Sequence, residues 1–265
     1  MPRITNHIGN IFPSPKAYFF IGLTYKNLTF TLAAVKEGIK MDQDIGLWTV
    51  IVLTFIFMAS YFWGRRKNYK IQKDMWKTLR KYIAPYGKRV DFKSYGTSAF
   101  QISVPGRKTD FFRRTELTVV LLPREIVLYF LFQKIRGKMD ELIVKTQFKS
   151  APKFSLEIIP RKMEVPERLK SKFKEVETNS FERISFFSSK EKLAKLLLDE
   201  APIRKRLKAI EGNLRFLSLS ADEPHLIFAC NLSSEIFPQI FPLIESFGSK
   251  VYELSMARKG RKNIK

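Results

Sequence analysis

A run of 19 uncharged residues, Ile45 to Trp63, interrupts an otherwise mixed pattern of apolar and polar positions. As a helix this run would be about 28 Å long, close to the thickness of the hydrocarbon core of a membrane. Trp48 lies near one end of the run and Trp63 lies at the other, where membrane helices concentrate aromatic residues. We therefore predict a transmembrane helix at 45–64, with a buried core helix as the alternative.

Basic residues follow this run directly, beginning with Arg65, Arg66 and Lys67, whereas the residues before it carry both signs of charge. The positive-inside rule then predicts that the chain after the span lies in the cytoplasm and that residues 1–44 lie outside or in a lumen. A cleavable signal peptide does not fit, because the run lies far from Met1 and is too long.

The segment before the span has a weaker pattern. Leu28, Leu32, Val35 and Ile39 recur at helical spacing, which favours a helix lying at the membrane surface. The alternative is a second span over residues 17–40, which would reverse the side on which the N-terminus lies.

Helical spacing continues after the span. Ile71, Met75, Trp76 and Leu79 recur with Lys and Arg between them, up to Pro85. Because the residue before a proline is disfavoured in a helix, the pattern predicts a basic juxtamembrane stalk helix over 65–85.

Beyond the stalk the apolar period changes to that of strands alternating with helices, which predicts a mixed α+β domain over 86–257. Val127 to Phe132 is apolar on all sides, which favours a fully buried core helix over a contact with a partner or a membrane surface. The expected strands cover 99–104, 116–122, 141–148, 155–159, 182–187, 214–219 and 225–230. The expected helices cover 124–136, a segment opened by Pro166, a segment capped by Ser189 with Leu193, Leu196 and Leu197 along one side, 203–210 and 235–256.

The composition shows a large positive charge, most of which lies after residue 44. The chain has 48 Lys and Arg against 25 Asp and Glu, a net charge of +23, and its 45% hydrophobic content is enough for a folded core. The first 44 residues hold five basic and three acidic residues, so about +21 lies after them. This balance indicates a polyanionic partner on the predicted cytoplasmic side.

The basic residues gather in three clusters, which are our candidates for contact with a structured RNA such as that of a ribosome. Clusters of this kind neutralise phosphates without reading sequence, and DNA is disfavoured beside a membrane. The alternatives are anionic lipid and a basic surface with no single partner. The clusters are Arg204, Lys205, Arg206 and Lys208; Lys134, Arg136 and Lys138; and Arg258, Lys259, Arg261 and Lys262 in the basic tail 258–265.

Motifs for catalysis are not found: the chain has no P-loop, GxGxxG, HExxH or GxSxG pattern. One Cys and two His exclude a disulfide framework and a Cys/His zinc site. Cys230 lies in an apolar strand pattern typical of a buried structural thiol, and His225 has no partner for acid–base chemistry. We expect no enzyme activity, no cofactor and no metal.

Four segments, in order, carry a resemblance to a known family. The first is the single span with its basic stretch, Arg65 to Trp76, and the next two are LTVVLLPREIVLYFLF and MDELIVKTQF. The last is LSLSADEPHLIFACNL with FPLIESFGSKVYEL, before a basic tail. Over about residues 60 to 262 this order resembles the calumin family, the coiled-coil-domain-containing proteins of the endoplasmic reticulum membrane.

The resemblance implies a scaffold of an intramembrane chaperone, the PAT complex, which pairs with the small membrane protein Asterix. That complex works with the Sec translocon and the ribosome in the biogenesis of multipass membrane proteins. It implies a single-pass protein of the endoplasmic reticulum membrane, or of the plasma membrane in a prokaryote, with the C-terminal domain in the cytosol. A basic tether that binds anionic lipid headgroups is the alternative function.

The chain departs from the family in two places. The family's long acidic lumenal segment is missing, since residues 1–44 hold three acidic residues. The family's C-terminal coiled coil is reduced to a short basic tail.

Overall fold

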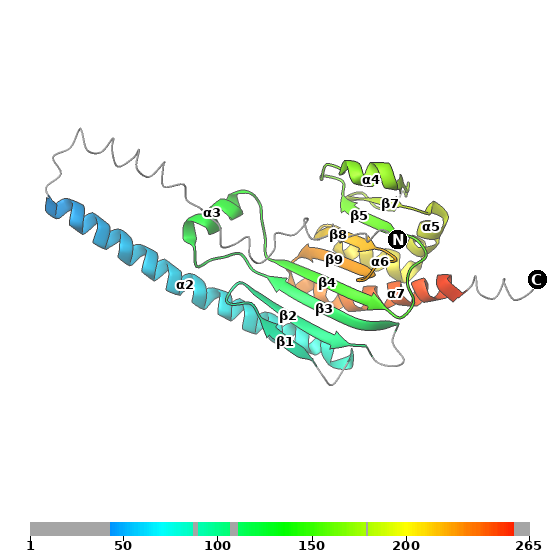
Figure 1. Ribbon diagram of the computed structural model, residues 1–265, viewed down its shortest axis with the longest axis horizontal. Helices are drawn as coiled ribbons and strands as arrows, with labels where there is room; N and C mark the ends of the chain where they lie inside the picture. Colours follow the sequence, from blue (N-terminus) through cyan, green and yellow to red (C-terminus); the bar gives the residue numbers. More distant parts are fainter. Residues whose placement is uncertain (1–42, 87–89, 107–110, 179, 257–265) are drawn as a thin grey trace, which may run out of the picture. The chain divides into compact units, whose positions relative to one another are not determined.

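The computed structural model describes residues 43–86, 90–106, 111–178 and 180–256 (Figure 1). The chain divides into two compact units, Met1–Phe55 and Ile56–Lys265. All described residues from Ile56 onwards, including the last eight residues of the apolar run, belong to the second unit.

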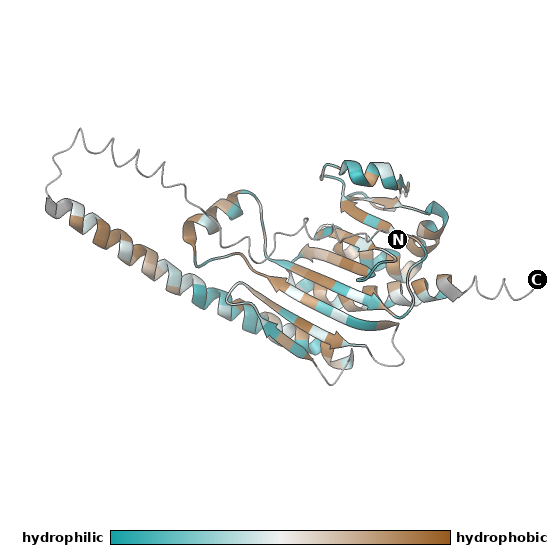
Figure 2. Cartoon of the chain, in the orientation of Figure 1, coloured by the Kyte–Doolittle hydropathy of each residue, from teal (hydrophilic) through white to brown (hydrophobic). Residues whose placement is uncertain are grey.

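The first described element is one uninterrupted helix, α2 (Gln43–Ile83), which ends in a short 3-10 turn, η3 (Ala84–Tyr86). Within the described residues it is the one helix long and apolar enough to cross a membrane, over 46–83. Its apolar half is exposed along its length, as at Leu47 and Phe55, and Figure 2 shows the change to a hydrophilic second half. The prediction that the stalk continues the apolar helix is confirmed.

Nine antiparallel strands follow in one sheet with the order β1-β2-β3-β4-β9-β8-β5-β7-β6. The predicted α+β fold class is therefore confirmed. The strands are β1 (Asp91–Ser94), β2 (Ala99–Pro105), β3 (Phe112–Val120), β4 (Glu141–Phe148), β5 (Leu156–Pro160), β6 (Lys174–Glu175), β7 (Ile184–Ser188), β8 (Leu214–Leu219) and β9 (Leu226–Asn231).

The helices after α2 are α3 (Val127–Ile135), α4 (Glu167–Lys172), α5 (Glu191–Leu198), α6 (Ala201–Ile210) and α7 (Phe237–Met256), with a 3-10 turn η4 (Ser234–Ile236) before α7. The main core joins one face of the sheet to α5, α6, α7 and the C-terminal end of α2, which contributes Leu79 and Ile83. Figure 1 shows α6 and α7 on that side of the sheet. The α4 helix packs on a second cluster around Ile159 and Phe187, on the opposite face.

Two local predictions are wrong. Ser189 does not cap α5: Lys190 occupies the N-cap position, and the Ser189 hydroxyl instead accepts the backbone N–H of Ser155 at 2.9 Å. Leu196 points to solvent and is 54% exposed, because α5 turns Ala194, Leu197 and Leu198 towards the core.

The expected buried helix around Val127–Phe132 is also wrong. The helix begins at Val127 rather than Arg124, because Ile126 N–H bonds Pro123 in a turn before it. Within α3, Gln133 alone is buried, while Leu128 is 67% exposed and Ile135 is 85% exposed. The segment is apolar, as predicted, but the described chain covers one side of the helix only.

Candidate functional site

The first basic cluster lies on α6, and its position follows from the helix's apolar stripe. Ile203, Leu207 and Ile210 are buried against the sheet, so the intervening positions face outwards. The cations at these positions are exposed, except that Arg206 is half-buried and donates from Nη1 to the Pro202 carbonyl oxygen at 3.2 Å. The exposed members are Arg204, Lys205 and Lys208.

No ion pair involves these four cations within the described part of the chain, and α6 itself has no acidic residue. Glu200, directly before the helix, is held by Lys250, with the carboxylate oxygen 2.5 Å from Nζ. The structure therefore brings four positive charges together on one helix, and the carboxylate directly before that helix is already paired.

The second cluster lies at the C-terminal end of α3, where Lys134, Arg136 and Lys138 are all exposed. The Arg136 guanidinium lies 4.1 Å from the centroid of the Phe132 ring, and the Lys134 ammonium lies 5.9 Å from that of Phe130. The cluster is thus interleaved with aromatic rings. The third cluster, Arg258, Lys259, Arg261 and Lys262, lies outside the described residues.

The residues expected to flank a membrane are exposed on α2. Trp48 is 65% exposed and Trp63 is 58% exposed, and Arg65, Arg66 and Lys67 all face outwards. The Lys67 ammonium lies 4.8 Å from the Trp63 ring centroid. Aromatic and basic side chains therefore occur together at the end of the apolar run, as the sequence predicted.

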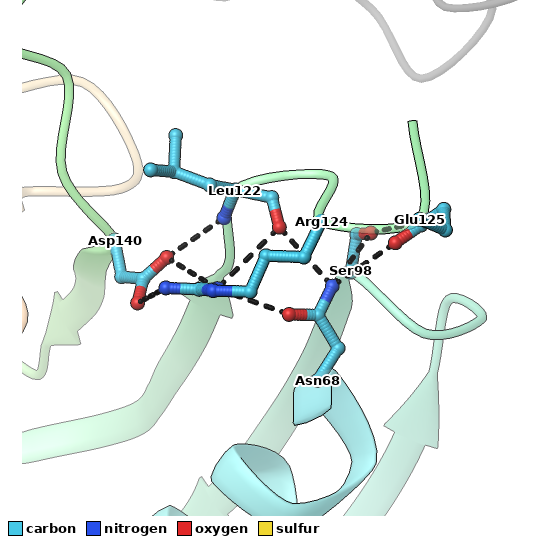
Figure 3. A network of polar contacts seen from close by, with 6 residues as sticks. All are labelled: Asn68, Ser98, Leu122, Arg124, Glu125 and Asp140. Carbon is cyan, nitrogen blue, oxygen red and sulfur yellow. Dashed lines mark hydrogen bonds and ion pairs between the residues drawn. The ribbon is translucent and has the colours of Figure 1, made fainter. Parts of the chain in front are cut away.

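A buried polar network joins α2 to the loop that leads into α3 (Figure 3). Asn68 is fully buried, and its Nδ2 donates to the Leu122 carbonyl oxygen and to Glu125 Oε2, each at 3.1 Å. Its Oδ1 accepts a hydrogen bond from Arg124 Nη1 at 3.0 Å. Glu125 Oε1 in turn accepts from the Ser98 hydroxyl at 2.9 Å.

Sequence reasoning missed this network, because Asn68 carries no signal of burial in a helix segment rich in Lys and Arg. A glycine gives the one local hint. A β-carbon on Gly64 would overlap with the Arg124 carbonyl oxygen, so the loop before α3 passes directly against α2 at Gly64. Gly64 and Asn68, one turn apart, together fix where the loop that leads into α3 meets α2.

The titratable groups singled out in the sequence are structural in their surroundings. His225 Nδ1 accepts the backbone N–H of Phe148 at 2.9 Å, and burial lowers the pKa of this imidazole. Cys230 is fully buried, which raises the pKa of its thiol. The described residues include no group of three or more His, Cys, Asp or Glu arranged to hold a metal ion.

A surface hollow of about 540 Å³ lies between α6, α7 and the start of β3. Its polar lining includes Glu200, Glu245, Glu253 and Lys250. Lys250 bonds the carboxylates of both Glu200 and Glu253, at 2.5 Å and 3.0 Å. Two of these three carboxylates are thus neutralised within the hollow.

The sequence was compared with models of known families and with curated proteins. No family model matches this chain, and no curated protein matches it. The exposed basic helix α6 and the long apolar helix α2 are the two features that bear on function.

Proposed function

We propose that this chain is a single-pass scaffold of the endoplasmic reticulum membrane that binds ribosomes beside a Sec translocon. In this proposal it acts in an intramembrane chaperone of the calumin type, with a small Asterix-like partner, and assists the biogenesis of multipass membrane proteins. The observation that carries the ribosome-binding role is the α6 cluster, Arg204, Lys205, Arg206 and Lys208, which has no carboxylate partner among the described residues.

The membrane part of the proposal is supported by α2. Its apolar half is long enough to cross a bilayer and is exposed along its length. Arg65, Arg66 and Lys67 follow the apolar run at the end that leads to the α+β domain. Basic residues beside a span usually lie on its cytoplasmic side. The α+β domain would then lie in the cytosol, where ribosomes are available.

The α6 geometry suits a phosphate backbone better than a small anion. Its cations project from a helix anchored by three buried side chains, so the spacing of their backbone positions is fixed before binding and little backbone entropy is lost. Phosphate contacts release counterions, and the resulting affinity falls steeply with salt. A ribosome presents such phosphates over a broad surface close to the membrane.

The test uses the full chain in lipid nanodiscs and cosedimentation with purified ribosomes over a series of salt concentrations. The variant carries Arg204→Glu, Lys205→Glu and Lys208→Glu, and we expect weaker binding with a shallower dependence on salt. The matched control carries Lys162→Glu, Lys170→Glu and Lys172→Glu, which change net charge equally at exposed positions around α4. Equal losses in both variants would show that net charge alone is responsible and would remove α6 from the proposal.

A basic lipid tether is the second candidate, and the exposed Trp63 and Lys67 beside the apolar run favour it. A tether would let vesicles that carry the chain capture a second population of anionic vesicles. Capture that ribosomes do not compete away would support the tether, whereas ribosome binding without capture would support the scaffold.

A further inference from the structure

The α3 helix presents an apolar stripe to its surroundings. Leu128, Leu131, Phe132 and Ile135 follow the spacing i, i+3, i+4 and i+7, and their exposed fractions are 67%, 48%, 47% and 85%. Gln133 lies on the opposite side of the helix and is buried. Soluble surfaces rarely leave such a stripe uncovered, so it indicates a contact with something apolar.

The contacts of the preceding loop place the start of α3 beside α2. The Arg124 backbone lies directly against Gly64, the residue that follows the apolar run. One turn later, Asn68 bonds the Leu122 carbonyl oxygen and the Arg124 side chain. Since α3 begins three residues after Arg124, the helix starts beside the point where the apolar half of α2 ends.

The inference rests on the proposed function in one respect, that α2 spans the membrane. Gly64 would then lie at the boundary between hydrocarbon and headgroups. Nine helical residues extend about 13 Å, so no residue of α3 lies further than that from the start of the helix. Interfacial helices bury their apolar side about 5–10 Å into this region.

The positive charge at the C-terminal end of α3 favours a surface that carries phosphate groups. The helix contains no acidic residue, and Lys134, Arg136 and Lys138 are exposed around its C-terminal end. Arg136 lies over the Phe132 ring, so a cation accompanies an apolar side chain of the stripe. Long basic side chains of this kind reach phosphate groups while their stems stay in apolar surroundings.

We infer that α3 is an interfacial anchor, which inserts the stripe Leu128, Leu131, Phe132 and Ile135 into the leaflet on the domain's side of the membrane. The basic residues after it bind anionic phospholipid headgroups. Because the network of Asn68, Arg124 and Asp140 holds the base of α3, this second attachment fixes the orientation of the sheet to the bilayer (Figure 3). Lipid is the occupant favoured by the position at Gly64 and by the cations at the helix end.

The test places an environment-sensitive fluorophore on the full chain in vesicles of phosphatidylcholine, with and without phosphatidylserine. Leu131→Cys reports on the stripe, and Leu196→Cys on α5 is the matched control, since that leucine is 54% exposed on another helix. We expect a blue-shifted emission and quenching by spin-labelled lipid at position 131 but not at 196. Unmodified protein serves as the labelling blank, because Cys230 is buried.

The outcomes are distinct. A solvent-like label at 131 in vesicles overturns the anchor, and shielding of that label in native membranes alone would assign the stripe to a protein partner. Replacing Lys134, Arg136 and Lys138 with Gln should remove any added quenching due to phosphatidylserine; unchanged quenching would overturn the headgroup contact. Extraction of the chain by alkaline carbonate would instead show that α2 does not span the membrane, which is a failure of the proposed function.

Discussion

Arg124 and Asp140 close the loop that carries α3, with a paired hydrogen bond across its base. Arg124 Nη2 lies 2.7 Å from Asp140 Oδ2, and Nη1 lies 3.1 Å from Oδ1. The two side chains are 11% and 16% exposed. Asp140 also accepts the Leu122 backbone N–H at 2.7 Å. One ion pair therefore holds both ends of the segment that contains α3.

Replacing Arg124 with Met should lower the free energy of unfolding by about 3 kcal/mol, because it leaves a largely buried carboxylate without its partner. Urea-induced unfolding of the full chain in mild detergent, followed by pulse proteolysis, measures this change. The control is Arg113→Met, which breaks the Arg113–Glu223 pair at 3.5 Å with exposed side chains. That variant should change stability by less than about 1 kcal/mol. Equal effects would contradict a special role for the Arg124 pair.

Two glycines of α2 should respond differently to the same substitution. At Gly46 no described atom lies within 4 Å of an added β-carbon, so Gly46→Ala should leave stability unchanged or raise it by up to about 1 kcal/mol. At Gly64 the added carbon would overlap the Arg124 carbonyl oxygen, so Gly64→Ala should destabilise the contact with α2. Limited proteolysis in the loop before α3 reports on this contact, and equal protection in both variants would contradict the prediction.

Much of the fold could be predicted because it follows from local pattern. Strand β4 covers the predicted residues 141–148, and α6 follows from the helical spacing of Ile203, Leu207 and Ile210. The edge strands β1 and β6 gave no such signal, since every residue in them is exposed. Their pairing depends on the neighbouring strand rather than on their own side chains.

The candidate sites also include features that a local pattern predicts and features that it does not. The cations of α6 were predictable from sequence, because a helix with three buried positions must turn the others outwards. The exposure of α3 was not predictable, because periodicity reports which side chains are apolar and not what covers them. The burial of Asn68 depends on partners 54 and 57 residues further along the chain, which no local pattern encodes.

Glu157 should make stability depend on pH. This β5 carboxyl is buried, and desolvation raises its pKa to about 7, against smaller opposite effects of the Ser218 hydroxyl and the Arg168 charge. Below the ordinary value of 4.5 it is protonated in both folded and unfolded chains. As pH rises from 4.5 to 7, unfolding releases a proton, so stability falls by at most about 3 kcal/mol and then levels off.

The variant Glu157→Gln should lose this fall and be more stable than the parent chain at pH 8. Urea unfolding at a series of pH values between 4 and about 8 measures both effects. Glu164→Gln, at an exposed position, is the control and should keep the pH profile of the parent. A Glu157→Gln profile with the same slope as the parent would assign the pH dependence to other groups.

Replacing the buried Gln133 of α3 with an apolar residue should stabilise the fold. The Gln133 side-chain carbonyl oxygen is buried and has no hydrogen-bond partner among the described residues. An unsatisfied buried acceptor costs about 1–3 kcal/mol, so Gln133→Met, which keeps the length of the side chain, should stabilise the fold by about 1 kcal/mol. The opposite exchange on the outer side, Leu131→Gln, should leave the free energy of unfolding in detergent unchanged, because Leu131 is already exposed there. Urea unfolding of both variants separates the two sides of the helix, and destabilisation by Gln133→Met would show that its amide is satisfied in solution.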